Sequence, residues 1–234
     1  MERVVILHYH LFKNAGTSVD RILKSNFPGK WVTAEFERKP GPKGNSDLVA
    51  QWIKDNPEAV AFSTHTAWGP IPEIPGVRII SVLFLRDPIE RIRSAYRFER
   101  QQQANTLGAR LAKEHDFEGY VRARLAIPND RQCRNFQTER LASMVPGPEP
   151  ELERARKALE RITVVGIVSE FDHSMGQLAA RVQLHFPDFT WQSIRANASA
   201  GHNRVTPEDD QLISLLRHAN QDDLMLLNGM GSRT

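Results

Sequence analysis

The fold of this chain is decided by one strand-to-helix corner, His10-Leu11-Phe12-Lys13-Asn14-Ala15-Gly16-Thr17-Ser18. Residues 3–8 before it are apolar and β-branched, which is typical of a buried parallel strand. After it, apolar side chains recur at helical spacing, and Thr17 and Ser18 stand where N-cap hydroxyls belong. Gly16 lets the backbone approach a ligand closely, and the first N–H groups of the helix favour an anion. With the charge of Lys13, the corner predicts a cradle for a phosphate or sulfate group.

The spacing of this corner differs from that of the nucleotide-binding P-loop, in which a lysine directly follows the last glycine. Here Lys13 precedes Gly16 by three positions. Ordinary hydrolysis of ATP or GTP is therefore a poor fit. On this stretch alone, the alternative is a strand–turn–helix corner with a surface lysine.

A second corner of the same kind lies at residues 77–88. Residues 77–85 form a nearly continuous apolar run, and Arg86 follows at its carboxyl end. Open α/β sheets bind ligands outside the carboxyl ends of their strands, and a planar guanidinium suits a terminal phosphate. The alternative for Arg86 is a local ion pair with Asp87 or Glu90.

The helix after this second corner begins at Pro88, a residue suited to the first helical position. Its periodicity separates two sets of side chains. The pattern predicts that one set, Ile89, Ile92 and Tyr96, faces the core. The other set, Arg91, Ser94 and Arg97, is predicted to face away from it.

Together the two corners resemble the cofactor signature of the sulfotransferases that use 3′-phosphoadenosine 5′-phosphosulfate (PAPS). Residues 12–18 resemble that family's loop for the 5′-phosphosulfate, and residues 85–96 resemble its element for the 3′-phosphate. The similarity points to the carbohydrate branch, which includes heparan sulfate 2-O-sulfotransferase and bacterial relatives. Further stretches fit that branch in the expected order, namely residues 135–138, 165–171, 197–199 and 220–226.

The resemblance implies transfer of a sulfuryl group from PAPS to a hydroxyl of a carbohydrate or another alcohol, without a metal ion. Lys13 would stabilise the leaving phosphate oxygen, and His65 would be the general base. The residues that would bind the donor are Lys13, Asn14, Ala15, Gly16, Thr17, Ser18, Arg86, Ser94 and Ser199. The loop at residues 197–204 resembles the segment that closes over the adenosine in this family.

His65 is also a reasonable base on chemical grounds. It follows a short apolar strand at residues 59–63, so it is expected at the same sheet edge as the two corners. Histidine is the side chain that titrates nearest neutral pH, which suits removal of a proton from an attacking hydroxyl. Thr64 replaces the glycine that precedes this histidine in the family, and Ser63 stands where the heparan branch has a second histidine. These departures leave the acceptor geometry open, and a hydrogen-bonded structural histidine is the alternative.

Length and composition fit one globular enzyme domain. The chain has 234 residues, of which 40% are hydrophobic and 25% charged, so it can bury a substantial core. Alternating strands and helices predict an α/β protein with a central parallel sheet. The resemblance implies a P-loop-NTPase-like three-layer α/β/α fold, as a single sulfotransferase domain over residues 1–234 with a helical insertion at about residues 88–145.

The sequence also limits the expected partners and compartment. It has no apolar run long enough to span a membrane and one cysteine, Cys133, so a reducing, bacterial cytoplasm is expected. The net charge of +3 does not require a nucleic acid. Arginines concentrate in residues 86–140, where they suit an anionic donor and an acidic glycan acceptor. For most of them the expectation is a solvated helical face, paired with Glu90, Glu99 and Glu118. The oligomeric state is open.

Two other functions fit parts of the sequence: a nucleotide-dependent kinase, and a non-catalytic protein that binds a nucleotide or glycan on the same fold. A zinc site is a further alternative, because His8 and His10 share a strand face and His65 follows a neighbouring strand. The expectation is nevertheless that His8 and His10 support the core or the loop, and that no metal is bound.

Overall fold

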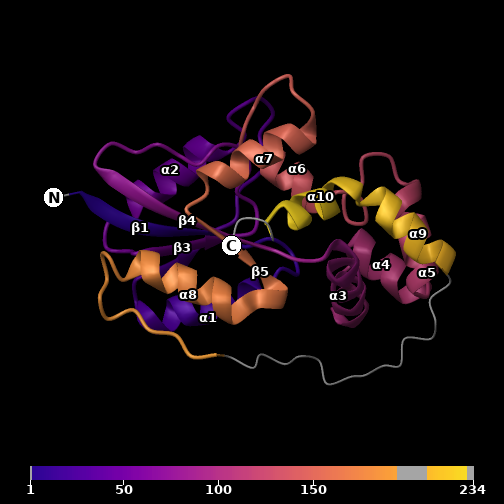
Figure 1. Ribbon diagram of the computed structural model, residues 1–234, viewed down its shortest axis with the longest axis horizontal. Helices are drawn as coiled ribbons and strands as arrows, with labels where there is room; N and C mark the ends of the chain where they lie inside the picture. The colour runs from indigo at the N-terminus through magenta and orange to yellow at the C-terminus, as the bar shows by residue number, and fades with distance from the viewer. Residues whose placement is uncertain (1, 194–209, 231–234) are drawn as a thin grey trace. The chain divides into compact units, whose positions relative to one another are not determined.

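The computed structural model describes residues 2–193 and 210–230, which divide into two compact units (Figure 1). The first unit comprises residues 2–85 and 140–193. The second comprises residues 86–139 and 210–230. The single domain predicted over residues 1–234, with its insertion at residues 88–145, stays a prediction.

The first unit is built on a five-stranded parallel sheet with the order β2-β3-β1-β4-β5. The strands are β1 (Arg3–Tyr9), β2 (Trp31–Thr33), β3 (Ala61–Thr64), β4 (Val77–Leu85) and β5 (Val164–Ile167). The predicted α/β class and parallel sheet are confirmed. Tyr9 pairs with Thr64 on one side and with Leu83 on the other. The carboxyl ends of β1 and β3 therefore open on one edge, where residues 10–15 and His65 follow.

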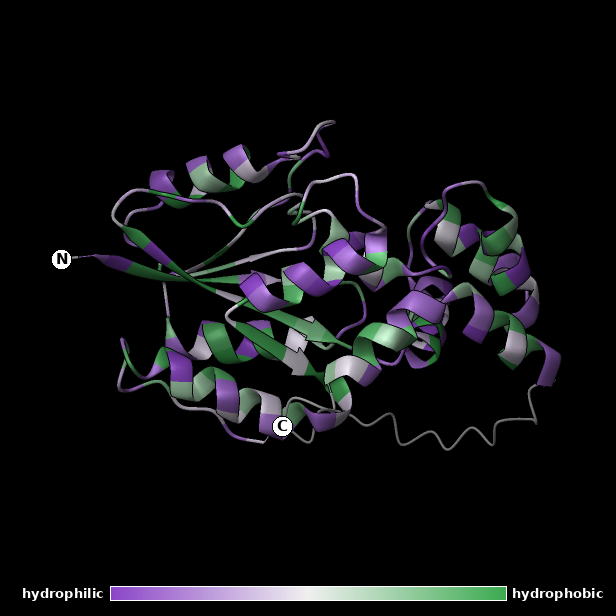
Figure 2. Cartoon of the chain, turned by 45° about the horizontal axis from the view of Figure 1, so that its top comes forward, coloured by the Kyte–Doolittle hydropathy of each residue, from purple (hydrophilic) through white to green (hydrophobic). Residues whose placement is uncertain are grey.

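Helices cover both faces of this sheet and make three layers (Figure 1). One face carries α1 (Gly16–Asn26) and α8 (Phe171–Val182), with a single 3₁₀ turn, η1 (Val168–Glu170), before α8. The other face carries α2 (Ser46–Asp55) and α7 (Glu151–Arg161). Alternate residues of β1 point to opposite faces, so Ile6 joins Val19 and Leu178 in the core beneath α1 and α8. Figure 2 shows the strands as largely hydrophobic and the helices as two-sided.

The second unit is helical. It contains α3 (Pro88–Gln101), α4 (Leu107–Glu114), α5 (Phe117–Ala126), α9 (Asp210–Ala219) and α10 (Gln221–Met230), while α6 (Phe136–Ala142) contains the boundary between the units. The starts of α3, α4 and α5 are capped by Asp87, Thr106 and Asp116, whose side chains accept from backbone N–H groups. The core joins these early helices to α9 through Ile92, Val121, Cys133, Leu212 and Leu216.

A buried polar network, here called the Glu99 network, lies inside the second unit. Arg124 donates to Glu99 Oε1 at 3.0 Å and to Asp130 Oδ2 at 2.7 Å. Tyr120 donates to Glu99 Oε2 at 2.5 Å. The side chains of Glu99 and Arg124 are each only 10% exposed. The expected solvated face is therefore wrong for this pair, although the exposed pair of Arg122 and Glu118 fits it.

Arg91 is the clearest correction to the predicted helix faces. The pattern places it away from the core, but it is fully buried. Its guanidinium donates to the carbonyl of Gln132 and lies over the ring of Phe136, 4.5 Å from the centroid. A planar, weakly hydrated guanidinium can stack on an aromatic ring in this way, which periodicity alone does not reveal.

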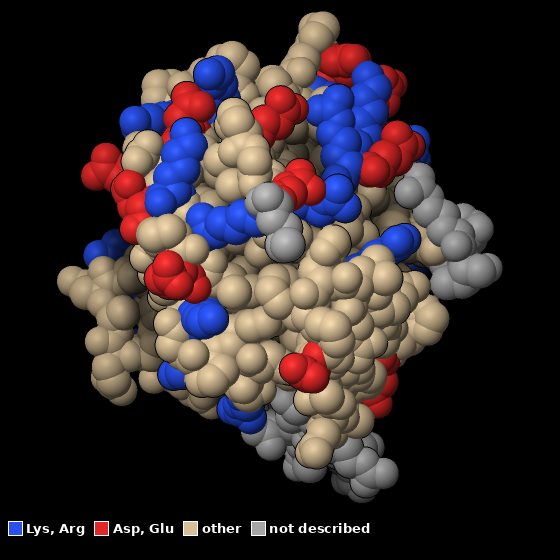
Figure 3. All heavy atoms as spheres, turned by 90° about the vertical axis from the view of Figure 1, so that its left-hand side faces the viewer, with Lys and Arg blue, Asp and Glu red and all other residues tan. Residues whose placement is uncertain are grey.

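Charges on the face drawn in Figure 3 are mixed, with lysines and arginines next to aspartates and glutamates. This face therefore offers no single-sign surface of the kind that favours nucleic acid. Within residues 2–193 and 210–230, each helix is too short or too polar to cross a membrane.

Candidate functional site

The loop between β1 and α1 has the backbone of an anion cradle. Lys13 and Ala15 both adopt left-handed conformations, with φ of 64° and 60°. Such conformations are uncommon for residues with a Cβ, and alternation of backbone handedness turns successive N–H groups toward one concave side. Asn14 is buried and donates from Nδ2 to the carbonyl of Phe84 at 2.7 Å, which fastens the loop to the end of β4. The loop is therefore fixed before any ligand arrives.

The start of α1 differs from the prediction. Thr17 and Ser18 do not cap the helix, because the N-cap is Ala15, which has no side-chain oxygen. The two hydroxyls instead lie in the first helical turn, Thr17 exposed and Ser18 half-buried. The first N–H groups of a helix have no partner within it. Here the N-cap side chain accepts none of them, although the N–H of Ser18 donates to the carbonyl of Ala15 at 2.9 Å, so the N–H groups before Ser18 are the ones suited to an anion.

Gly16 is required by the packing of a neighbouring side chain. A Cβ at this position would lie 2.0 Å from Cδ2 of His10. The imidazole of His10 therefore occupies the space that any other residue at position 16 would fill. The sequence explained this glycine by the approach of a ligand, whereas the structure adds the packing of His10.

Three imidazoles and two carboxylates gather at this sheet edge, here called the histidine cluster: His8, His10, His65, Asp20 and Glu35. Asp20, on α1, accepts from Nδ1 of His8 on Oδ1 and from Nδ1 of His10 on Oδ2, both at 2.8 Å. Partial burial alone would raise the pKa of Asp20, but the hydrogen bonds from His10 and His8 hold it well below its ordinary value. Asp20 thus stays ionised and fixes both rings.

His65 is held by Glu35, which follows β2. Its Nδ1 donates to Oε1 of Glu35 at 2.7 Å, and the ring lies tilted against His10 with 3.9 Å between centroids. The side chains of His65 and Glu35 are 51% and 50% exposed. Partial burial would raise the pKa of Glu35, but hydrogen bonds from Thr66 and His65 lower it. With Nδ1 bound to a carboxylate, Nε2 is the nitrogen that can accept a proton.

The segment that carries His65 is itself fixed by two side chains. Arg140 donates to the carbonyls of His65 at 2.9 Å and Ala67 at 2.8 Å. Asn45 accepts from the N–H of Trp68 at 2.7 Å and donates to the carbonyl of Thr66 at 2.8 Å. The position of His65 therefore depends on contacts far along the chain.

Three predicted residues do not belong to the described part of the first unit. Arg86 and Ser94 belong to the second unit, where the Arg86 guanidinium lies 3.9 Å from Oε2 of Glu90 and Ser94 is half-buried on α3. Their assignment to the 3′-phosphate stays a prediction. Ser199 and the rest of the predicted closing loop lie outside the described residues.

Two of the further stretches that resemble the sulfotransferase family, residues 135–138 and 220–226, contact each other within the second unit. Asp223 Oδ1 accepts from the N–H and the hydroxyl of Thr138, both at 2.7 Å. Asn220 Oδ1 accepts from the N–H of Asn135 at 3.1 Å. These contacts hold the start of α6, so both stretches have a structural role.

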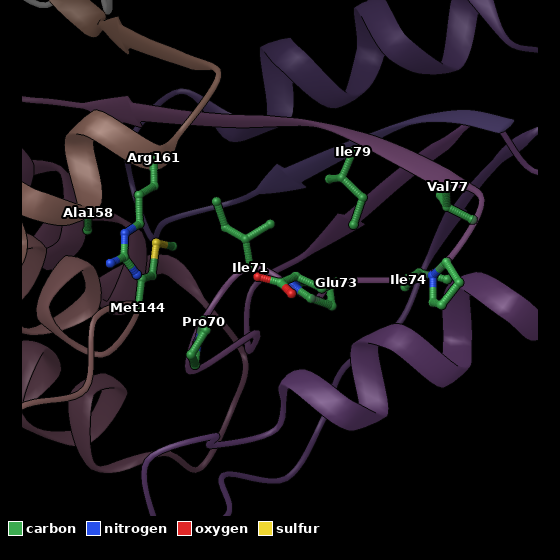
Figure 4. A pocket seen from close by; sticks show the side chains of 11 residues that line it. Pro70, Ile71, Glu73, Ile74, Val77, Ile79, Met144, Ala158 and Arg161 are labelled. Carbon is green, nitrogen blue, oxygen red and sulfur yellow. The ribbon is translucent and has the colours of Figure 1, made fainter. Parts of the chain in front are cut away.

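A cavity of about 880 Å³ lies in another part of the first unit (Figure 4). Its mostly apolar lining includes Pro70, Ile79 and Met144, with Glu73 and Arg161 as charged members. Val77 lines it too, at the amino-terminal end of β4, where it pairs with Arg3 at the start of β1. His8 and His10 lie at the opposite, carboxyl-terminal end of β1, so the cavity is separate from the candidate site.

Sequence reasoning missed Asp20, Glu35, Asn45 and Arg140 as parts of this site. It expected His10 to support the core or the loop, with a zinc ligand as the alternative. Glu35 follows a strand of three residues, too short for a periodic signal. Asp20 sits one turn inside α1, where an acid gives no motif. A usable signal was the pairing of His8 and His10 with an acid on the next helix.

The chain is 38% identical to an uncharacterized protein of Archaeoglobus fulgidus over 242 aligned positions, which cover 97% of this chain and 95% of that protein. The chain therefore belongs to the same family as this archaeal protein. No model of a known protein family matches the chain.

Proposed function

We propose that the protein is a PAPS-dependent sulfotransferase on a P-loop-NTPase-like fold, acting on a hydroxyl of a glycan, a glycolipid or another alcohol. The observation that carries the proposal is the place of His10. Its ring packs against Gly16 of the anion loop and against the ring of His65, with 3.9 Å between the ring centroids. The imidazole of His10 thus contacts both a loop suited to an anion and a histidine suited to accept a proton. A cytoplasmic location is part of the proposal.

The loop would bind the phosphosulfate end of the donor. Its turned N–H groups and the start of α1 favour negative charge, and the Lys13 ammonium would meet the bridging oxygen as charge develops there. Loss of one such donor typically costs about 10²–10³ in rate. The hydrogen bond from Asn14 to the carbonyl of Phe84 fastens the loop, which limits the reorganisation that accompanies this stabilisation.

His65 would act on the acceptor. As the hydroxyl oxygen attacks sulfur, its proton passes to Nε2 of His65, while Glu35 holds Nδ1–H and stabilises the imidazolium. The new bond joins sulfur to the acceptor oxygen, and the broken bond joins sulfur to the phosphate oxygen. The electron pair of the broken bond leaves with adenosine 3′,5′-bisphosphate, so the reaction balances without a redox step or a metal.

The first test is calorimetric titration with adenosine 3′,5′-bisphosphate. The wild-type protein should bind it more tightly than adenosine 5′-monophosphate, and Lys13→Ala should weaken binding. Lys54→Ala, which removes an exposed lysine from α2, is the matched control and should bind normally. The second test is incubation with ³⁵S-labelled PAPS and a panel of glycans and small alcohols.

Transfer of label to one acceptor, lost in Lys13→Ala and kept in Lys54→Ala, would support the proposal. If titration with the bisphosphate gives no heat and the protein turns over ATP in a magnesium-dependent reaction, the protein is a kinase instead. Binding of the bisphosphate that survives His65→Gln, with no labelled product from any acceptor, would identify a non-catalytic binding protein.

A further inference from the structure

We propose that His8, His10 and Asp20 form a binding site for a divalent transition metal ion of the zinc type. The three residues come from two adjoining core elements. His8 lies near the end of β1, His10 follows that strand directly, and Asp20 lies in the second turn of α1. One ligand atom from each lies within 4.8 Å of those of the other two. Three groups that can ligate a metal thus already converge.

The donor set suits such an ion. Two imidazole nitrogens and one carboxylate oxygen are ligands that zinc, cobalt and ferrous iron share, and catalytic zinc sites often use three protein ligands. In ligating form, two neutral imidazoles and one carboxylate carry a single negative charge, which a divalent cation would offset. His8 is 1% exposed and His10 is 9% exposed, so they are withdrawn from competing water.

The atoms that would ligate already face one another. Both Nδ1 atoms lie 2.8 Å from the carboxylate oxygens of Asp20. Ligation through Nδ1 requires only that each imidazole hold its proton on Nε2, because the hydrogen bonds to Asp20 would be replaced by bonds to the ion. Ser63 Oγ, 3.3 Å from Nδ1 of His8, adds a further oxygen beside the site.

The geometry also corrects the zinc alternative drawn from the sequence, which used His65 as the third ligand. The Nδ1 of His65 is bound to Glu35 at 2.7 Å. The ring of His65 is tilted by 32° against that of His10, and the ligand atoms that converge belong to His8, His10 and Asp20. Asp20 therefore replaces His65 in the set.

The test uses the full chain, purified without a polyhistidine tag and freed of metal with EDTA that is then removed. Titration with Co²⁺, followed by visible absorption, and competition with Zn²⁺ give the stoichiometry and affinity. The wild-type protein should bind one equivalent. Loss of an outer partner of a metal ligand costs about 10–100-fold in affinity, so Asp20→Asn and His8→Gln should each cost at least about 100-fold.

Two matched variants separate this site from other histidines. His65→Gln and His173→Gln should bind Co²⁺ as the wild type does, because neither residue belongs to the set. The proposal is independent of sulfuryl transfer, since the donor is absent from the titration. Circular dichroism establishes that each variant is folded, and if Asp20→Asn is not, His8→Gln and His10→Gln decide.

The proposal fails if the metal-free protein binds no equivalent of either ion. It also fails if folded Asp20→Asn and His8→Gln bind as tightly as the wild type. In the first case the three residues are a hydrogen-bonded clamp, in which Asp20 orients two imidazoles. As a second readout, Zn²⁺ should raise the unfolding temperature of the wild type and of His65→Gln, but not that of Asp20→Asn.

Discussion

The histidine cluster of the first unit and the Glu99 network of the second both place charges inside the protein, but they end differently. In the Glu99 network, Arg124 is held between two carboxylates, and all its members belong to the interior. The histidine cluster begins with buried His8 and ends at half-exposed His65 and Glu35. A closed network is out of reach of solvent and ligands, whereas a row of imidazoles open at one end can bind a ligand and exchange protons.

The largest effect is expected from a substitution at His65, the exposed end of the histidine cluster. His65→Gln should lower kcat/KM for sulfuryl transfer by about 10²–10⁴-fold, because general base catalysis contributes that much. The half-exposed ring is a small part of the packing, so the free energy of unfolding should change little. Enzyme assay and urea denaturation measure the two quantities. His173→Gln, on α8, is the control, and an unchanged rate in His65→Gln would remove the base from the mechanism.

The next effect breaks the closed network. Arg124→Ala should lower the free energy of unfolding by about 3–5 kcal/mol, since it leaves the carboxylates of Glu99 and Asp130 buried and unpaired. Arg122→Ala removes the exposed neighbour that pairs with Glu118 and should cost about 0–1 kcal/mol. Urea denaturation compares them. Equal losses would show that the Glu99 network is as well hydrated as the surface.

A smaller effect is expected from Cys133, whose buried thiol makes the stability of the second unit depend on pH. Burial raises the pKa of its thiol from 9.0 to about 12. Above pH 9 only the unfolded chain releases this proton, so the thiol makes stability fall as pH rises, by about 1.4 kcal/mol at pH 10. Urea denaturation at pH 8 and pH 10 measures the free energy of unfolding. Between these pH values, Cys133→Ala should lose about 1.4 kcal/mol less of it than the wild type. A native thiol that reacts at once with a disulfide reagent at pH 8 would contradict its burial.

The smallest effect concerns the partner of His65. Glu35→Gln should lower kcat by about 2–5-fold with little change in KM, because a half-exposed ion pair contributes about 0.2–1 kcal/mol. The amide keeps the shape but stabilises the imidazolium less. Steady-state assays of Glu35→Gln and of the neighbouring control Glu37→Gln measure it. A loss as large as that of His65→Gln would mean that Glu35 itself takes the proton.

The sequence predicted the framework well because apolar runs leave few choices. The strand at residues 77–85 was predicted with the bounds that β4 has, and the helix at Pro88 begins there. The helix after residue 15 was also right, but its cap was not, since the N-cap is a left-handed Ala15 without a side-chain acceptor. Local patterns cannot anticipate a cap made by backbone conformation alone.

The charged residues were harder, because their roles depend on partners distant in sequence. Arg91 and Arg124 look solvated on a helical pattern, yet a ring, a carbonyl and two carboxylates from other segments bury them. Asp20 and Glu35 gain meaning only when α1 and β2 bring them to His8, His10 and His65. The candidate base was found by its place after a strand, and its neighbours were not.

The path of the chain through the second unit has a consequence for its synthesis. Residues 86–139 leave the ribosome early, but their core is completed by Leu212 and Leu216 on α9, and α6 is capped by Asp223 on α10. Until those last helices emerge, α3 to α5 present an unfinished apolar surface. Nascent chains stalled before residue 210 should therefore be the ones that chaperones hold and proteases cut.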